Sequence, residues 1–284
     1  MEKVGLGRLA DTNVVPLDFQ ELADNSKRFI SGTASDLVRD GYDSSHPWMM
    51  NAHADPTDKK PAFLLGRGWS ATLEKRQMIA DAGIPVMAIN DYPADGPKPK
   101  YWCAGDGPSY YGRRIWDDPD VIKFSAINNL AMACPREDAY APLVTPKESP
   151  NTHFVHPVNN LMEMESWLHV PYIAWGTSLF GPHTPKQFND SGAGRSSMLI
   201  GLRLLWHLGY REVFMLGCDC TPHHHPAPNY WKVMFHYIDQ LKQVFLDNQF
   251  GVYQCNPDSH LRTFPIVDFY DVLSYCLRRE INAA

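Results

Sequence analysis

Features that mark several protein classes are scarce in this 284-residue chain. There is no excess of positive charge, because 26 Lys and Arg residues stand against 32 Asp and Glu residues and give a net charge of −6 at pH 7. The sequence pI is about 6.0. A basic field over the whole surface, which would attract nucleic acid, is therefore excluded. A local basic groove would have to form around the nearest group of cations: Lys98, Lys100, Arg113 and Arg114.

Long apolar runs and paired cysteines are also missing. No apolar span reaches the length of about 18 residues that a transmembrane helix needs, and the chain does not begin with a basic segment followed by an apolar one. The six cysteines are scattered, at positions 103, 134, 218, 220, 255 and 276. We therefore expect a soluble cytoplasmic protein whose cysteines act as small buried hydrophobic residues rather than disulfide partners.

The most informative segment that is present runs from Ser191 to Asp219, with the sequence SGAGRSSMLIGLRLLWHLGYREVFMLGCD. Ser191, Gly192 and Gly194 allow the backbone to turn tightly and to approach a ligand. A nearly uncharged helix is predicted directly after this turn, from Ala193 to Leu208. The N–H groups and positive dipole end of such a helix favour binding of an anion, typically a phosphate.

The same segment ends in a short apolar run, Glu212 to Leu216, that predicts a central strand buried on both faces. Asp219 lies just beyond it, where open α/β sheets place their ligands. The alternative is an ordinary connection between helix and strand that binds nothing.

The rest of the pattern predicts an α/β fold of the Rossmann type, with a mostly parallel sheet, helices on both faces and a lid region. We expect an N-terminal extension over residues 1–60, a nucleotide-binding catalytic domain over 61–284, and a proline-rich loop or lid at about 133–160. Strands are predicted at 62–65, 85–89, 101–104, near 121–124, at 212–216 and at 251–255, and helices at 71–82, 193–208, 230–248 and 267–279.

The first candidate binding loop, Gly66-Arg67-Gly68-Trp69-Ser70, follows the strand at 62–65 and opens a helix. Its glycines allow close approach of the backbone, and Ser70 is placed to cap the helix or to bond a phosphate. The loop is neither a Walker A motif nor a full GxGxxG fingerprint, so a plain turn is an equal alternative.

Polar residues also follow the next two predicted strands. Asn90 and Asp91 end the second strand and are candidates to recognise a ribose or a base edge, while Asp106 ends the third. In each case an Asx turn or simple turn is the alternative interpretation.

Beyond Asp219 the chain continues as Cys220-Thr-Pro-His223-His224-His225. Three adjacent histidines cannot face one way, and one of them is a candidate general base because imidazole titrates near neutral pH. A zinc site with Cys and His ligands is an alternative, although Cys-x-Cys is tighter than the usual zinc spacing. The second alternative is that the histidine tract is a solvated polar loop.

The order of these motifs carries a family resemblance. The chain resembles the small bacterial CMP-sialic-acid-dependent sialyltransferases in the order of three segments. The segments are GRGWS with a helix and VMAIN, then SGAGRSSMLIGLRLLWHLGYREVFMLGCD, then GVYQCNPDSHLRTFP. The series is also similar to a related family that includes archaeal 6-hydroxymethylpterin diphosphokinases and many proteins that are often phage-encoded. The match covers roughly residues 62–275, with specific order and low identity.

The resemblance implies a single Rossmann-like domain with a mobile lid, which binds a nucleotide at the first glycine loop and at the strand ends. It implies that the nucleotide is held by Asn90, by Ser191 and Gly192, and by the late stretch containing Asn256 and Ser259. A simple turn is the alternative for that last stretch. Where the sialyltransferases carry Asn-Gly-Pro-Ser, this chain has Arg67-Gly68-Trp69-Ser70, which places an arginine at a phosphate and puts sialic acid in doubt as the donor sugar.

Taken together, these features predict a glycosyltransferase that moves a sugar from a nucleotide-activated donor to a cytosolic hydroxyl, with a histidine base and no obligatory metal. A 5-hydroxymethylpyrimidine in DNA is the specific acceptor candidate, as in phage DNA modification. The aromatic residues expected to stack on it, beside Arg113 and Arg114, are Trp69, Trp102, Tyr110, Tyr111 and Trp116.

Two other functions stay open. An ATP-dependent pyrophosphokinase would need Mg²⁺, with Asp106 and Asp219 as candidate ligands. A non-catalytic nucleotide-binding protein would not need the histidines at all.

Overall fold

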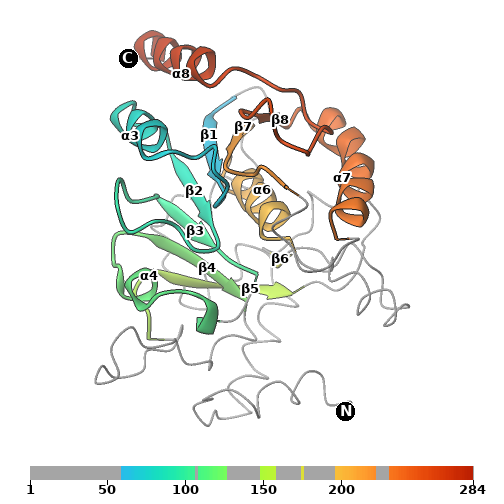
Figure 1. Ribbon diagram of the computed structural model, residues 1–284. Helices are drawn as coiled ribbons and strands as arrows, with labels where there is room; N and C mark the ends of the chain where they lie inside the picture. The colour runs from blue at the N-terminus through green and yellow to red at the C-terminus, as the bar shows by residue number, and fades with distance from the viewer. Residues whose placement is uncertain are drawn as a thin grey trace.

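A parallel β-sheet organises the chain, and the protein has an α/β, Rossmann-like fold (Figure 1). The computed structural model describes residues 59–105, 108–126, 148–157, 174–175, 196–221 and 230–283. Eight strands lie in the order β6-β5-β4-β3-β2-β1-β7-β8, and every neighbouring pair is parallel. The strands are β1 (Pro61–Leu65), β2 (Val86–Ile89), β3 (Tyr101–Cys103), β4 (Ile122–Ala126), β5 (Thr152–Pro157), β6 (Ala174–Trp175), β7 (Glu212–Leu216) and β8 (Gly251–Gln254).

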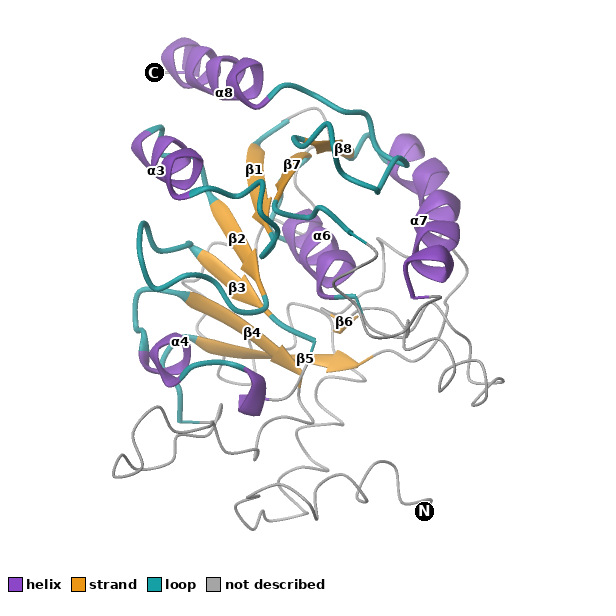
Figure 2. Cartoon of the chain, viewed as in Figure 1, coloured by secondary structure: helices purple, strands orange, loops and turns teal. Residues whose placement is uncertain are grey.

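Helices cover both faces of this sheet (Figure 2). The helices α6 and α7 pack on one face, where the largest hydrophobic cluster lies. The helices α3 and α8 pack on the other face over a second cluster, and α4 covers a third. The bounds are α3 (Leu73–Asp81), α4 (Arg113–Asp117), α6 (Ser197–His207), α7 (Tyr230–Asp247) and α8 (Phe269–Ala283), with a short 3-10 helix η3 (Pro108–Tyr110). Within the described parts of the chain, no helix is both long enough and apolar enough to cross a membrane.

The central strands β1 and β7 are apolar because both of their faces are covered. Ala62 and Leu64 join the cluster under α6 and α7, whereas Phe63 joins the cluster under α3 and α8. Phe63 is opposite Phe214 in the register of β1 and β7, and their ring centroids lie 5.7 Å apart. Truncating a buried phenylalanine to alanine costs roughly 3–5 kcal/mol, so this pair accounts for a large share of the fold's stability.

The order in which strands are added to the sheet reverses at β1. Strands β2 to β6 follow one another on one side of β1, and the chain then returns to place β7 and β8 on the other side. The carboxyl ends of β1 and β7 therefore form a topological switch point, where the loops that follow diverge and open α/β sheets bind their ligands.

Most predicted elements are confirmed within a few residues, and three differ from the prediction. The helix expected from Ala193 begins at Ser197. The cap of α3 is Thr72, whose side chain accepts a hydrogen bond from Lys75 N, and the predicted cap Ser70 is used elsewhere. Thr152–Pro157, expected to be loop, forms β5, because pairing with β4 supplies the backbone partners that a lid would lack. The rest of the expected lid and residues 1–58 lie outside the described residues.

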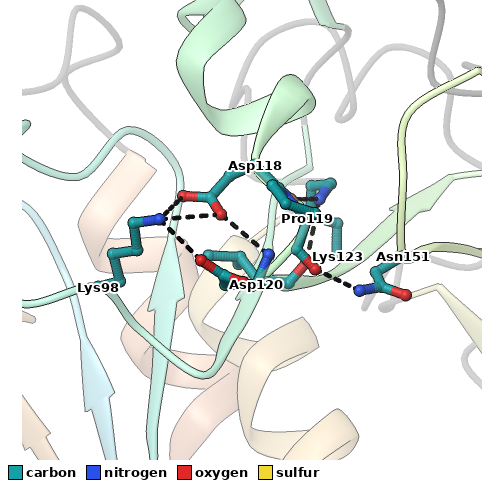
Figure 3. A network of polar contacts seen from close by, with 7 residues as sticks. Lys98, Asp118, Pro119, Asp120, Lys123 and Asn151 are labelled. Atoms are coloured by element: carbon teal, nitrogen blue, oxygen red, sulfur yellow. Dashed lines mark hydrogen bonds and ion pairs between the residues drawn. The ribbon is translucent and has the colours of Figure 1, made fainter.

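A buried lysine lies at the amino end of β4 (Figure 3). The side chain of Lys123 is fully buried, and its Nζ donates to the carbonyl oxygens of Asp118 at 2.5 Å and Val121 at 3.0 Å. Beside it, Lys98 pairs with Asp118 and Asp120 at the surface. Burial lowers the pKa of Lys123 to about 8, and the nearby carboxylate of Asp118 only partly opposes this.

We expect Lys123→Met to change the pH dependence of unfolding. The pKa of Lys123 is about 8 in the folded protein, whereas an ordinary lysine has a pKa of 10.5, so between these values the unfolded chain holds a proton that the folded chain lacks. The wild type should therefore gain stability relative to the variant as the pH rises, by at most about 1.4 kcal/mol per pH unit. Urea unfolding from about pH 7.5 to about pH 10 measures this difference. The exposed Lys242→Met is the control, and a difference that stays constant with pH would contradict the prediction.

Candidate functional site

At the switch point, the loops after β1 and β7 lie backbone against backbone. Gly66 N donates to Leu216 O at 2.9 Å, and Gly68 N donates to Gly217 O at 2.7 Å. A Cβ atom at Gly66 would lie 2.3 Å from Gly217 O, and one at Gly68 would lie 2.2 Å from a carboxylate oxygen of Asp219. Contact between the loops thus accounts for the glycines that the sequence suggested for approach to a ligand.

A buried polar cluster fastens these loops together, and we call Ser70, Asp219, Asn256 and Ser259 the Asp219 clasp. The carboxylate of Asp219 accepts hydrogen bonds from Ser70 Oγ at 2.5 Å, from Asn256 Nδ2 at 2.8 Å and from Ser70 N at 3.0 Å. Asp219 is 2% exposed. Hydrogen bonds to a charged group are the stronger kind, and they offset the cost of burying this carboxylate.

The clasp extends to the loop after β8 through Ser259. Its hydroxyl accepts hydrogen bonds from Gln254 Nε2 at 3.1 Å and from Leu261 N at 3.2 Å. The same hydroxyl donates to the carbonyl oxygen of Asp219 at 3.2 Å. Asn256 closes the same loop by accepting from Asp258 N at 3.0 Å. The ends of β1, β7 and β8 are therefore joined by side chains as well as by the sheet.

The clasp alters the roles predicted for its members. Ser70, expected to bond a phosphate, donates to Asp219 and accepts from Gly217 N at 2.8 Å, so its hydroxyl is used inside the protein. Asn256 and Ser259 lie beside the loops, as the resemblance implied, but the hydrogen bonds that they form are also internal. Gln254, which is fully buried and donates to Cys218 O at 3.0 Å, is a positioning residue that no sequence pattern indicated.

Two side chains of the first loop point outward. Trp69 is 58% exposed, and Arg67 is exposed as well. Among the described residues Arg67 has no carboxylate partner. The loop after β1 therefore presents an exposed guanidinium and, two residues further along the chain, an exposed indole ring. These are the groups that bind phosphate and stack on flat rings.

Asn90, at the end of β2, is connected to the start of α6. Its backbone is left-handed, with φ 62°, and its side-chain oxygen accepts from Ser197 Oγ at 2.6 Å and from Tyr111 Oη at 3.3 Å. Ser197 in turn accepts from Gly105 N at 3.1 Å. Ser197 was not among the predicted site residues, and its signal was the serine pair before the apolar run of α6. Tyr111 was predicted to stack on a base, not to hold Asn90.

The first turn of α6 has two features that favour an anion. Ser196 is its N-cap but makes no capping bond through its side chain, and the first turn contains no acidic residue. Unsatisfied N–H groups and the helix dipole favour negative charge at such an end. Asn90 fixes this turn beside the carboxyl edge of the sheet through Ser197.

Asp91 lies next to Asn90 but is already paired. Its carboxylate contacts Arg114 Nη2 at 2.9 Å, and Arg114 also stacks over the ring of Tyr92 at 4.7 Å. Burial raises the pKa of Tyr92, and Arg114 partly opposes the shift. Asp91 therefore anchors the loop after β2, and a ribose hydroxyl would have to compete with Arg114.

The remaining predicted residues lie outside the described residues: Asp106, Ser191, Gly192, Gly194, His223, His224 and His225. Of the histidine tract, only its amino-terminal side is described. Cys218 and Cys220 are buried, and burial raises the pKa of Cys220 to about 12. The zinc alternative stays open, because the histidines that it needs lie outside the described residues.

The five aromatic residues proposed to stack on a base do not share one surface. Trp102, Tyr111 and Trp116 are core residues packed edge to face, with ring centroids 5.2 Å and 5.0 Å apart. Only Trp69 and Tyr110 are exposed, at 58% and 72%. Both follow carboxyl ends of strands, so the exposed pair lies on the same edge of the sheet.

Comparison with known proteins gives one distant structural likeness. The chain is similar to a solved structure of the sialyltransferase CstII from Campylobacter jejuni in complex with a substrate analogue, cytidine-5'-monophosphate, with a TM-score of 0.34 and 11% sequence identity over 72% of this chain and 84% of that chain. No protein-family model matches the chain. No curated protein matches it by sequence.

We expect Asp219→Asn to destabilise the protein. An amide replaces one carboxylate oxygen with a donor, which must then face either Ser70 N or both Ser70 Oγ and Asn256 Nδ2, all of which donate to the native carboxylate. Losing hydrogen bonds to a buried charge and setting donor against donor should cost about 2–4 kcal/mol. Urea unfolding measures the loss. The exposed Asp247→Asn, which also gives up the charge of a hydrogen-bonded aspartate, is the control and should change stability by less than about 1 kcal/mol.

Proposed function

We propose that this protein is a glycosyltransferase that binds a nucleotide-activated sugar at the carboxyl edge of β1, β2 and β7. The observation that carries the proposal is the pair Arg67 and Trp69, which project from a loop that the Asp219 clasp holds rigid at the switch point. An exposed cation and an exposed indole ring on one short loop match the two parts of a nucleotide, its phosphate and its base.

Each group has a defined task in this proposal. The Arg67 guanidinium and the first turn of α6 neutralise the charge that develops on the departing phosphate, which is the usual source of the largest catalytic effect. Trp69 stacks on the base. Asn90, whose side-chain oxygen is used by Ser197 and Tyr111, offers its amide N–H group to the ribose or the base.

In the reaction, the acceptor oxygen attacks the anomeric carbon while the bond from that carbon to the phosphate oxygen breaks. The electron pair of that bond leaves on the phosphate, and the acceptor proton goes to a base. We assign the base to one of His223, His224 and His225, as the sequence predicts. Asp219 is a positioning residue in this scheme, because its carboxylate is buried and hydrogen-bonded in the clasp.

A hydroxymethylated pyrimidine in DNA is the acceptor that we propose to test first. Trp69 and Tyr110 support it as exposed rings on one edge of the sheet. Arg113 and Arg114 contribute less than the sequence suggested, because they pair with Asp117 and Asp91. Transfer of sugar to hydroxymethylated DNA but not to unmodified DNA would support this acceptor, and transfer to neither would remove it.

We expect nucleotide binding to depend on Arg67 and Trp69. Thermal shifts with UDP-, CMP- and GDP-sugars and with ATP and Mg²⁺ identify the nucleotide. For that nucleotide, Arg67→Met and Trp69→Leu should each weaken binding by roughly tenfold or more, since a charged hydrogen bond and a stacked base are each worth about 1–3 kcal/mol.

Matched controls lie on α8, away from the switch point. Arg278→Met removes an exposed arginine, and Tyr270→Leu removes a ring that is 50% exposed. Neither change should alter nucleotide affinity. If Arg67→Met and Trp69→Leu bind as tightly as these controls, the nucleotide does not lie on the first loop and the proposal fails.

Chelation separates the glycosyltransferase from the pyrophosphokinase that the sequence left open. The kinase needs Mg²⁺ on carboxylates, and the carboxylate of Asp219 already accepts three hydrogen bonds inside the clasp. We therefore expect sugar transfer to continue in EDTA. Replacing His223, His224 and His225 by alanine should abolish transfer while nucleotide binding persists; unchanged turnover would remove these histidines from the mechanism.

A further inference from the structure

The connection between β2 and β3 leaves part of the sheet without a helix above it. Residues 90–100 contain three prolines, at positions 93, 97 and 99, and Gly96 with φ +96°. Proline inside a helix removes a hydrogen bond and clashes with the preceding turn, so this segment crosses the sheet as an irregular loop. It reaches α3 at Gly96, where an added Cβ would lie 2.5 Å from Leu73 Cδ1.

A cavity of about 270 Å³ lies beneath this loop. Its floor is apolar and comes from Leu65 of β1 and from Val86 and Ala88 of β2. Arg76 and Ala80 of α3 form one wall, and the loop residues Tyr92, Pro97 and Pro99 form the other. The volume is slightly below the usual range for drug-sized ligands, which suits a molecule with one ring.

The wall from α3 contains a buried cation whose hydrogen bonds are incomplete. Arg76 is 8% exposed, and its Nη1 donates to the carbonyl oxygen of Asp95 at 2.8 Å. Its Nη2 lies 3.6 Å from a carboxylate oxygen of Asp95, a side chain that is itself 67% exposed. Its Nε is buried and has no partner among the described residues. A buried donor without an acceptor is costly, so this edge of the guanidinium favours an acceptor with two oxygens.

The remaining charges at the cavity also favour an anion. Lys98 and Lys100 line it together with Arg76. Lys98 is partly neutralised by Asp118 and Asp120, while Lys100 stacks over the ring of Tyr101 at 5.3 Å. Tyr92 adds no negative charge, because a phenol is neutral at pH 7 and burial raises its pKa further. Cations therefore outnumber anions among the lining residues.

We propose that this cavity is a second binding site, for a small organic acid with an apolar ring, whose carboxylate pairs with the guanidinium of Arg76. The ring packs on Leu65, Val86 and Ala88. The site is distinct from the nucleotide site, because Arg76 and Ala80 face the underside of the loop and take no part in the Asp219 clasp. The same loop begins at Asn90, so an occupant is expected to act on the nucleotide site through that residue.

The Nε–H of Arg76 gives a direct test. In protein labelled with ¹⁵N-arginine, Arg76→Met identifies its resonance, and benzoate is the probe. We expect benzoate to shift this resonance in a saturable manner, with affinity in the millimolar range, and benzyl alcohol, which lacks the charge, to leave it in place. An equal response to both compounds, or no response to benzoate, would overturn the proposal.

Variants supply an independent readout by calorimetry. Arg76→Met should weaken benzoate binding by about tenfold or more, whereas Arg278→Met should not. Ala80→Phe keeps Arg76 and fills the cavity from an exposed helical position, so it should abolish binding in a folded protein even if Arg76→Met does not fold. Benzoate binding that survives in Ala80→Phe would place the probe elsewhere and refute the site.

Discussion

The buried carboxylate of Asp219 is the interaction on which the functional edge of this protein depends. Parallel strands fix the ends of β1, β7 and β8 near one another, but the loops that follow are free to diverge. Asp219 joins all three, because it accepts hydrogen bonds from Ser70 after β1 and from Asn256 after β8. Water cannot replace these partners without moving the loops, since Asp219 is 2% exposed.

The clasp also explains why the first loop can present Arg67 and Trp69. Backbone hydrogen bonds to Leu216 and Gly217 fix the position of this loop, and its glycines permit the close contact. The outward side chains therefore project from a backbone whose position is fixed. The polar residues of the edge are thereby divided between two tasks. The clasp residues form their hydrogen bonds inside the protein and hold the loops together. Arg67 and Trp69 are exposed to solvent and can contact a ligand.

At this edge, binding or catalytic roles were predicted for Ser70 and Asp219 because they follow strands, and for Asn256 and Ser259 because of the family resemblance. These roles stay predictions, and what the structure adds is that the four side chains bond to one another or to the backbone inside the protein. Position along the chain does not tell whether a side chain turns inward or outward. Ser70 and Asp219 bond over a separation of 149 residues, which no local pattern reveals. Trp102 and Trp116 were likewise considered for a surface, yet they pack in the core under α4.

The sequence alone determined the parallel α/β architecture, because runs such as 62–65 and 213–216 are apolar at every position and can be stable only when both faces are covered. It also determined that ligands belong at the carboxyl edge, since this follows from the order of strands and helices. Only the tertiary structure decided which polar groups at that edge are satisfied internally, that Lys123 is buried with a pKa of about 8, and that a cavity lies beside Arg76. These features depend on contacts between segments far apart in the chain, and burial and hydrogen bonding at such contacts exist only once the chain has folded.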